Sequence, residues 1–162
     1  MMRRLGLGVL ALAATAGFIP AGAGQAAADT QLPRLTVYSE TIGTFGDHDF
    51  CRGAIKLGYT VPTGKRGVVR MTFTSHGFIG NGAGWRRNPT CRALLIVSTA
   101  SATAINKETY VPIAFGSRPG QRITRDIVTG SGPVNIGVNA YALNTVVRTP
   151  QGQGVGAMAL VP

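Results

Sequence analysis

The sequence predicts an all-β fold: an antiparallel β-sandwich of about seven to eight strands with one disulfide. Three observations lead to this prediction. After residue 28, apolar and polar residues alternate in short segments, which is the period of strands rather than helices. Gly, Pro or Asn residues bound these segments and mark turns. The chain also contains exactly two cysteines, Cys51 and Cys91.

The first 28 residues have the pattern of a secretory signal peptide. An arginine pair is followed by an uncharged apolar run over 5–18 and by small residues over 21–28. This order of positive, apolar and small residues is typical of an export signal. The apolar run is shorter than the roughly 20 residues that a membrane-spanning helix needs.

Cleavage is expected after Ala28, which leaves a single β-sandwich domain over 29–162. An alternative cut follows Ala23, and an uncut membrane anchor is a further alternative. The pair Arg3-Arg4 leaves export by the twin-arginine route open. In each cleaved form the mature chain has no predicted transmembrane segment.

The first three strands are expected at 35–42, 51–59 and 67–74. In the first, Leu35 and Val37 share one face, as alternate residues on a strand do. In the second, every other residue from Cys51 onward is apolar or small, so this face is expected to point into the core. In the third, Val69 and Met71 point inward in the same way.

Five further strands complete the expected sandwich. Residues 94–97 are apolar without interruption, which indicates a strand that is covered on both faces. Turn residues such as Pro119-Gly120 separate the later segments. The five expected strands are 91–100, 110–115, 121–129, 134–143 and 155–161.

The two cysteines are expected to form a disulfide inside the core. An exported chain with two cysteines most simply pairs them. Cys51 and Cys91 each have the inward parity of their strand, and the bond would close a loop worth roughly 4 kcal/mol in the chain-entropy model. Free thiols or a redox pair are the alternative, although the sequence has no C-x-x-C. Trp85 lies in a loop close before Cys91 rather than on a core strand, so "immunoglobulin-like" describes the architecture only.

The chain is strongly basic. Its net charge is +10, and about +8 remains after loss of the arginine pair in the signal. Such a surface favours anionic partners, namely cell-envelope polymers, acidic lipids or acidic proteins. Nucleic acid is not expected, since the chain is exported and has no basic stripe interleaved with aromatic residues. The alternative is a solvated basic surface without a dedicated partner.

The glycine-rich segment 77–89 is the candidate binding loop. Exposed Phe78 and Trp85 beside Arg86 and Arg87 would combine apolar contact with attraction of anions. The alternative is a long hairpin loop in which Trp85 folds back to cover one end of the core.

A weaker candidate is a metal site formed by Asp47, His48 and Asp49 with His76. No H-x-H or H-E-x-x-H spacing supports it. The alternative is a turn in which Asp47 or Asp49 caps backbone amides. No catalytic residue and no cofactor are expected, so we expect a protein that is not an enzyme.

The Ala-rich end of the signal, the preference for Arg over Lys and the short strands give the chain a resemblance to small exported β-sandwich proteins of actinobacteria. The resemblance implies a secreted or envelope-associated protein without a catalytic role, and it carries over no functional residue. The expected function is therefore a non-enzymatic binding module for an anionic or protein partner. A secreted inhibitor of another protein and a small metal-dependent hydrolase are the alternatives.

Overall fold

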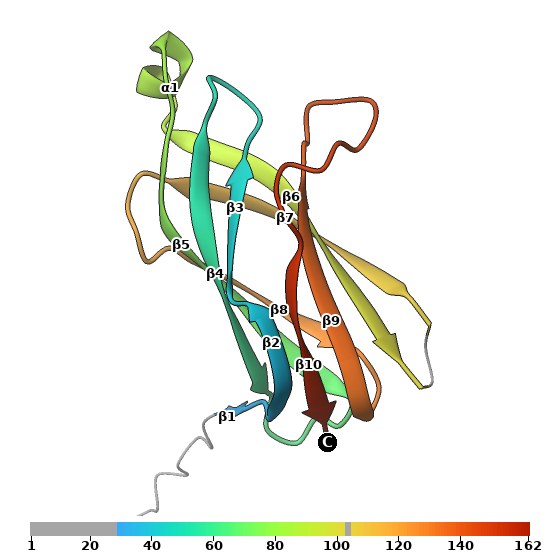
Figure 1. The fold of residues 1–162 in the computed structure, drawn as a ribbon. Coiled ribbons are helices and arrows are strands. Elements are labelled where there is room, and N and C mark those ends of the chain that lie inside the picture. The colour runs from blue at the N-terminus through green and yellow to red at the C-terminus, as the bar shows by residue number, and fades with distance from the viewer. Residues whose placement is uncertain (1–28, 103–104) are drawn as a thin grey trace, which may run out of the picture.

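Two antiparallel sheets pack face to face in the computed structural model, which describes residues 29–102 and 105–162 (Figure 1). The all-β prediction is confirmed, and the described residues form ten strands rather than seven to eight. The predicted signal peptide, 1–28, lies outside the described residues.

The first sheet is built around two long central strands. Two short strands pair with the same edge of β4 at different points along it, and β5 and β8 follow on the other side. Its members are β1 (Thr30–Gln31), β3 (Thr41–Phe45), β4 (Arg52–Val61), β5 (Val68–Ile79) and β8 (Arg122–Val128).

The second sheet has the strand order β2-β10-β9-β6-β7. Its members are β2 (Arg34–Ser39), β10 (Val155–Val161), β9 (Gly132–Tyr141), β6 (Thr90–Ser101) and β7 (Lys107–Gly116). One short helix, α1 (Ala83–Arg87), lies in the connection from β5 to β6, where the chain passes from the first sheet to the second. Two facing antiparallel sheets are the sandwich architecture that the sequence predicted, whereas the adjacent strands β3, β4 and β5 of the first sheet differ from the strand order of true immunoglobulin domains.

The first expected strand, 35–42, is divided between the two sheets. β2 pairs with β10, whereas β3 pairs with β4. The change occurs at Ser39, whose hydroxyl accepts a hydrogen bond from the Thr41 N–H, and Glu40, whose carbonyl accepts one from Leu57. β2 lies at the edge of its sheet, and the side chains of Leu35 and Val37 are exposed.

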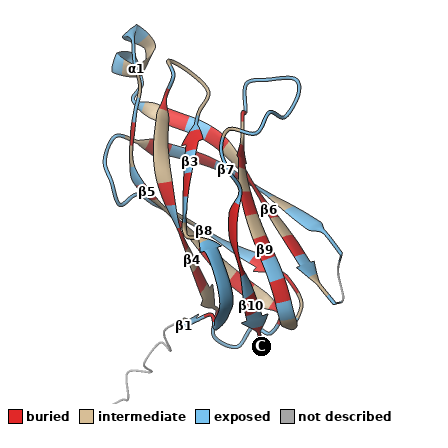
Figure 2. Ribbon diagram, in the orientation of Figure 1, coloured by how far each residue is buried: buried red, intermediate tan, exposed pale blue. Residues whose placement is uncertain are grey.

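The core lies between the sheets, and buried residues alternate with more exposed ones along the strands (Figure 2). Ile55 and Leu57 point inward from β4, and Val69 and Met71 do so from β5. On β6, Leu95 and Val97 point into the core, and Ile96 on the other face is buried as well. Leu94 on that second face is only half-buried, and Arg92 is exposed, so the second face of this strand is covered in part.

Candidate functional site

Three connections meet at one end of the sandwich, which we call the loop end (Figure 1). They are the β3–β4 loop (46–51), the β5–β6 connection with α1 (80–89) and the β9–β10 loop (142–154). The predicted disulfide is confirmed here: Cys51 and Cys91 are bonded, with 5.7 Å between their Cα atoms. Both cysteines are buried, and the bond joins the start of β4 in the first sheet to β6 in the second.

Asp47 joins the β3–β4 loop to β6. Its carboxylate accepts hydrogen bonds from the backbone N–H of Arg92 at 3.0 Å and from the Arg92 Nε at 2.7 Å. It also lies 2.9 Å from Nδ1 of His48. Burial alone would raise the pKa of Asp47, but the hydrogen bonds from His48 and Arg92 outweigh it and lower this pKa to about 2. The carboxylate is therefore charged and already paired.

His48 and the Asp47 carbonyl extend these links to the other two connections. His48 Nε2 lies 3.2 Å from the Asn88 carbonyl, next to α1, and the side-chain amide of Asn144 donates to the Asp47 carbonyl at 2.7 Å. The hydrogen bond to Asp47 raises the pKa of His48, because it favours the protonated ring. The β3–β4 loop thus contacts both of the other connections of the loop end.

Asp49 caps α1 from a different loop. The helix begins after Gly82, which has no side chain to accept a hydrogen bond from the first turn. The Asp49 carboxylate accepts one from the Trp85 N–H instead, and the Asp49 carbonyl accepts one from Asn81 at 2.8 Å. The interpretation of Asp47 and Asp49 as groups that cap backbone amides is therefore confirmed.

The candidate metal ligands do not all meet. Asp47, His48 and Cys51 have potential ligand atoms within 4.8 Å of one another, but the Cys51 sulfur is bonded to Cys91. Asp49 faces α1, and His76 is exposed on β5 outside any group of three or more potential ligands among the described residues.

Of the predicted binding residues, Phe78 is placed differently from the expectation. Its side chain is only 1 % exposed and contacts Phe115 with 5.9 Å between the ring centroids. The reason is a β-bulge at Gly77, which has a φ of 96°. The extra residue shifts the alternation of β5 by one, so Phe78 turns inward. The expectation that Phe78 is exposed was wrong.

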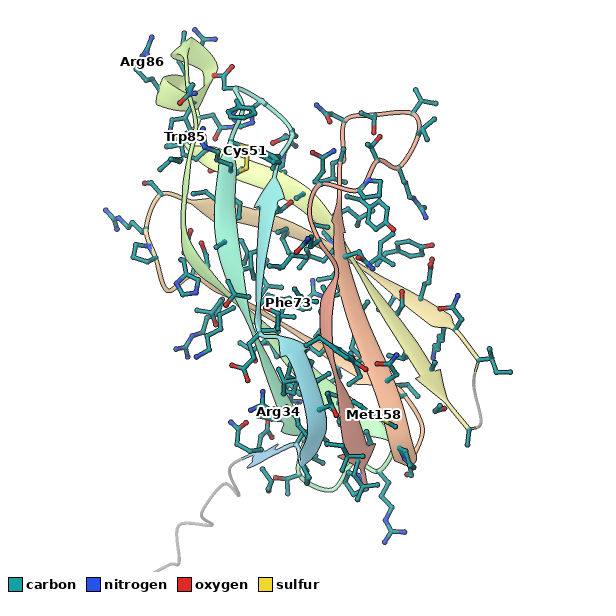
Figure 3. All side chains as sticks on the ribbon, in the orientation of Figure 1. Arg34, Cys51, Phe73, Trp85, Arg86 and Met158 are labelled. Carbon is teal, nitrogen blue, oxygen red and sulfur yellow. A yellow bond between two sulfur atoms is a disulfide. The ribbon has the colours of Figure 1, made fainter. Side chains whose placement is uncertain are left out.

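The other three predicted residues lie on α1. The Trp85 ring packs against the core cluster and over Gly80, as the folded-back alternative proposed. Arg86 and Arg87 are exposed, and Figure 3 shows Arg86 pointing away from the body of the protein. Neither arginine has a carboxylate partner among the described residues, and the only carboxylates in the three connections, Asp47 and Asp49, are engaged in hydrogen bonds.

Sequence reasoning missed a set of exposed apolar residues at the same end. The Phe45 and Phe50 rings lie 5.0 Å apart, and the guanidinium of Arg52 lies 5.0 Å from the Phe50 ring centroid. A cleft of about 450 Å³ separates this pair from the β9–β10 loop. In that loop Val146 and Val147 are exposed. The sequence did offer one signal for these residues. Val146 and Val147 are adjacent apolar residues between Asn144 and Pro150, in a segment without a strand pattern that would predict their burial.

The backbone that presents Phe50 is unusual. Asp49 and Phe50 have φ values of 47° and 51°, a left-handed conformation that non-glycine residues rarely adopt. Each such residue costs on the order of 1–3 kcal/mol and persists where the surroundings impose it. Here Asp49 and Phe50 are the two middle residues of the tight turn between β3 and β4, which a hydrogen bond from the Cys51 N–H to the His48 carbonyl closes at 2.8 Å. Phe50 is left exposed.

Comparison of the chain with protein families, with curated proteins and with solved structures finds no match in any of the three. Within residues 29–102 and 105–162, no helix has the length and apolar character needed to cross a bilayer.

Proposed function

We propose that the protein is an exported, non-enzymatic binding module that engages an anionic partner through its loop end. The observation that carries this proposal is the position of Arg86 and Arg87. Both are exposed on a helix that Asp49 caps and Trp85 anchors to the core. Two cations that are held in place without a nearby carboxylate attract anions more effectively than cations that are mobile or already bound to a carboxylate.

The distribution of acidic groups supports the same proposal. The chain has six carboxylate side chains, and each one accepts a hydrogen bond or forms an ion pair within the described structure. Away from the loop end, for example, Asp126 binds both Lys65 and Arg70. The excess positive charge is therefore left to face solvent or a partner.

The experiment compares two variants of equal net charge on phosphocellulose in a rising salt gradient. Arg86→Gln/Arg87→Gln removes the pair at the loop end, and Arg66→Gln/Lys107→Gln removes two exposed cations outside it, one in the β4–β5 connection and one at the start of β7. We expect the first variant to elute at clearly lower salt than the second, because exposed charges act over only about 10 Å at 0.1 M salt. Identical elution of the two variants would refute a site at the loop end.

A further inference from the structure

We infer that the loop end docks on an anionic lipid surface, with the side chains of Val146 and Val147 entering the interface. This inference rests on the proposed function, since it names the partner of the same basic end. The apolar contact and the basic charge are separate observations, and membrane binding by a folded domain usually needs both.

The β9–β10 loop presents aliphatic side chains directly to solvent. Val146 is fully exposed, Val147 is 74 % exposed, and Leu143 is also exposed nearby. Single exposed apolar residues are common, but adjacent ones at the end of a projecting loop indicate a contact surface.

Polar groups, not these aliphatic side chains, hold the loop in shape. The hydroxyls of Thr145 and Thr149 both donate to the Val147 carbonyl. Backbone hydrogen bonds close the base of the loop, from Ala142 to Thr149 at 3.0 Å and from Gln151 to Ala140 at 2.8 Å. The valine side chains therefore contribute little to the fold and remain available for contact.

A second apolar point lies on the opposite side of the cleft. Phe50 is 61 % exposed, and its ring contacts the partly exposed ring of Phe45. The left-handed backbone at Asp49 and Phe50 holds this ring outward. Phe50 and the two valines therefore lie on two neighbouring loops. A flat lipid surface can contact the protein at both of these apolar points.

Basic residues lie at the same end of the sandwich as these apolar points. Arg148 follows Val147 directly; its guanidinium lies 4.4 Å from the Tyr110 ring centroid and donates to the Tyr110 hydroxyl at 2.9 Å. Arg86 and Arg87 belong to α1, which lies at the same end (Figure 1). Cations beside an apolar loop are attracted by acidic headgroups while the apolar side chains leave water.

This combination favours a lipid surface over a soluble polyanion. A phosphate-rich or acidic polymer is hydrophilic, so it would pair with the arginines but would leave Val146 and Val147 in water. A bilayer offers acidic headgroups and, within about 5–10 Å of them, hydrocarbon that covers aliphatic side chains.

The test is flotation of the purified protein with vesicles of phosphatidylcholine alone or with about 30 % phosphatidylglycerol, at about 0.1 M salt. We expect binding to the acidic vesicles only. Val146→Ser/Val147→Ser removes the apolar pair without changing charge and is expected to weaken vesicle binding about tenfold. The same variant should elute from phosphocellulose as the unmodified protein does.

Ile105→Ser is the matched control, because Ile105 is 94 % exposed in the β6–β7 connection, which is not part of the loop end. Vesicle binding of this variant should equal that of the unmodified protein. Equal binding by the double valine variant would overturn the inference. Elution from phosphocellulose that depends on Arg86 and Arg87, without any vesicle binding, would also overturn it and leave the proposed function standing. Failure of both assays would refute both proposals.

Discussion

Asp47 and Arg92 form an ion pair that joins the two sheets, with 2.7 Å between Oδ2 and Nε. Asp47 follows β3 in the first sheet, and Arg92 lies on β6 in the second. Arg92 is the direct neighbour of Cys91, so this ion pair lies beside the disulfide. The base of the loop end is therefore held by a covalent bond and by a charged hydrogen bond that connect the same segments.

Gly46 packs against the disulfide and should not tolerate a larger side chain. A Cβ atom at this position would overlap the sulfur atoms of Cys91 and Cys51. We expect Gly46→Ala to lower the free energy of unfolding by about 1–3 kcal/mol, the usual cost of overpacking. Gly43→Ala is the matched control, since a Cβ there meets nothing within 4 Å. Urea unfolding followed by circular dichroism measures both; equal stability of the two variants would contradict the predicted contact.

Asp49→Ala should loosen α1, because the Trp85 N–H loses its acceptor. The expected loss of stability is about 1 kcal/mol, as for other helix caps. Hydrogen exchange in 80–88 should rise at the same time. Asp49→Asn keeps an acceptor oxygen and should retain most of the protection. Unchanged exchange in the alanine variant would show that Asp49 does not hold the helix.

The Asp47–His48 pair predicts a pH dependence of stability on both sides of neutrality. The pKa of His48 is raised by Asp47, so its contribution is complete below the ordinary value of about 6.5 and is lost as the pH rises through the raised value. The pKa of Asp47 is about 2, so its contribution is present above about 4 and is lost as the pH falls toward 2.

Urea unfolding of the His48→Gln variant at pH 6 and pH 8.5 checks the alkaline side. We expect the variant to lose less stability between these two values than the unmodified protein does. His76→Gln, which alters the exposed histidine of β5, should leave the difference in place. A His48→Gln variant with the full alkaline loss would show that another group causes it.

Tyr59→Phe is expected to maintain or raise stability. Across 29–102 and 105–162, the Tyr59 hydroxyl is the one buried polar side-chain atom that has no hydrogen-bond partner. Its burial raises the pKa of Tyr59 to about 12. An unsatisfied buried hydroxyl costs about 1–3 kcal/mol, so its removal should gain up to about 1 kcal/mol in thermal unfolding. Tyr110→Phe, which removes contacts to Glu108 and Arg148, should show no gain. A clear loss in the Tyr59 variant would reveal a partner for this hydroxyl.

The inward-facing residues of the strands and the disulfide were predictable, because side chains alternate between the two faces of a strand with a period of two residues. Ile55, Leu57 and Val69 are buried as expected, since a strand with one buried face must alternate. Cys51 and Cys91 share this parity, and so their sulfur atoms meet in the core.

Departures from regular pairing were not predictable from alternation. The bulge at Gly77 reversed the expected orientation of Phe78, and the corner at Ser39 and Glu40 moved half of one expected strand into the other sheet. Both depend on which partner strand lies alongside, and that partner is distant in the sequence.

The candidate site was predictable in its charge but not in its apolar part. Arg86 and Arg87 are exposed as expected, because charged side chains without partners remain in water. The turn that presents Phe50 is closed by the hydrogen bond from Cys51 to His48, and through Asp49 it contacts α1, a contact between segments more than 30 residues apart in the chain. No local pattern encodes such a contact.

Thr30 and Pro162 line the same cavity, of about 510 Å³, at the end of the sandwich opposite the loop end (Figure 1). A covalent attachment of the protein to a solid support at this end would therefore leave the loop end facing solvent. Immobilised in this way, every molecule would present Arg86 and Val146 outward in the same orientation.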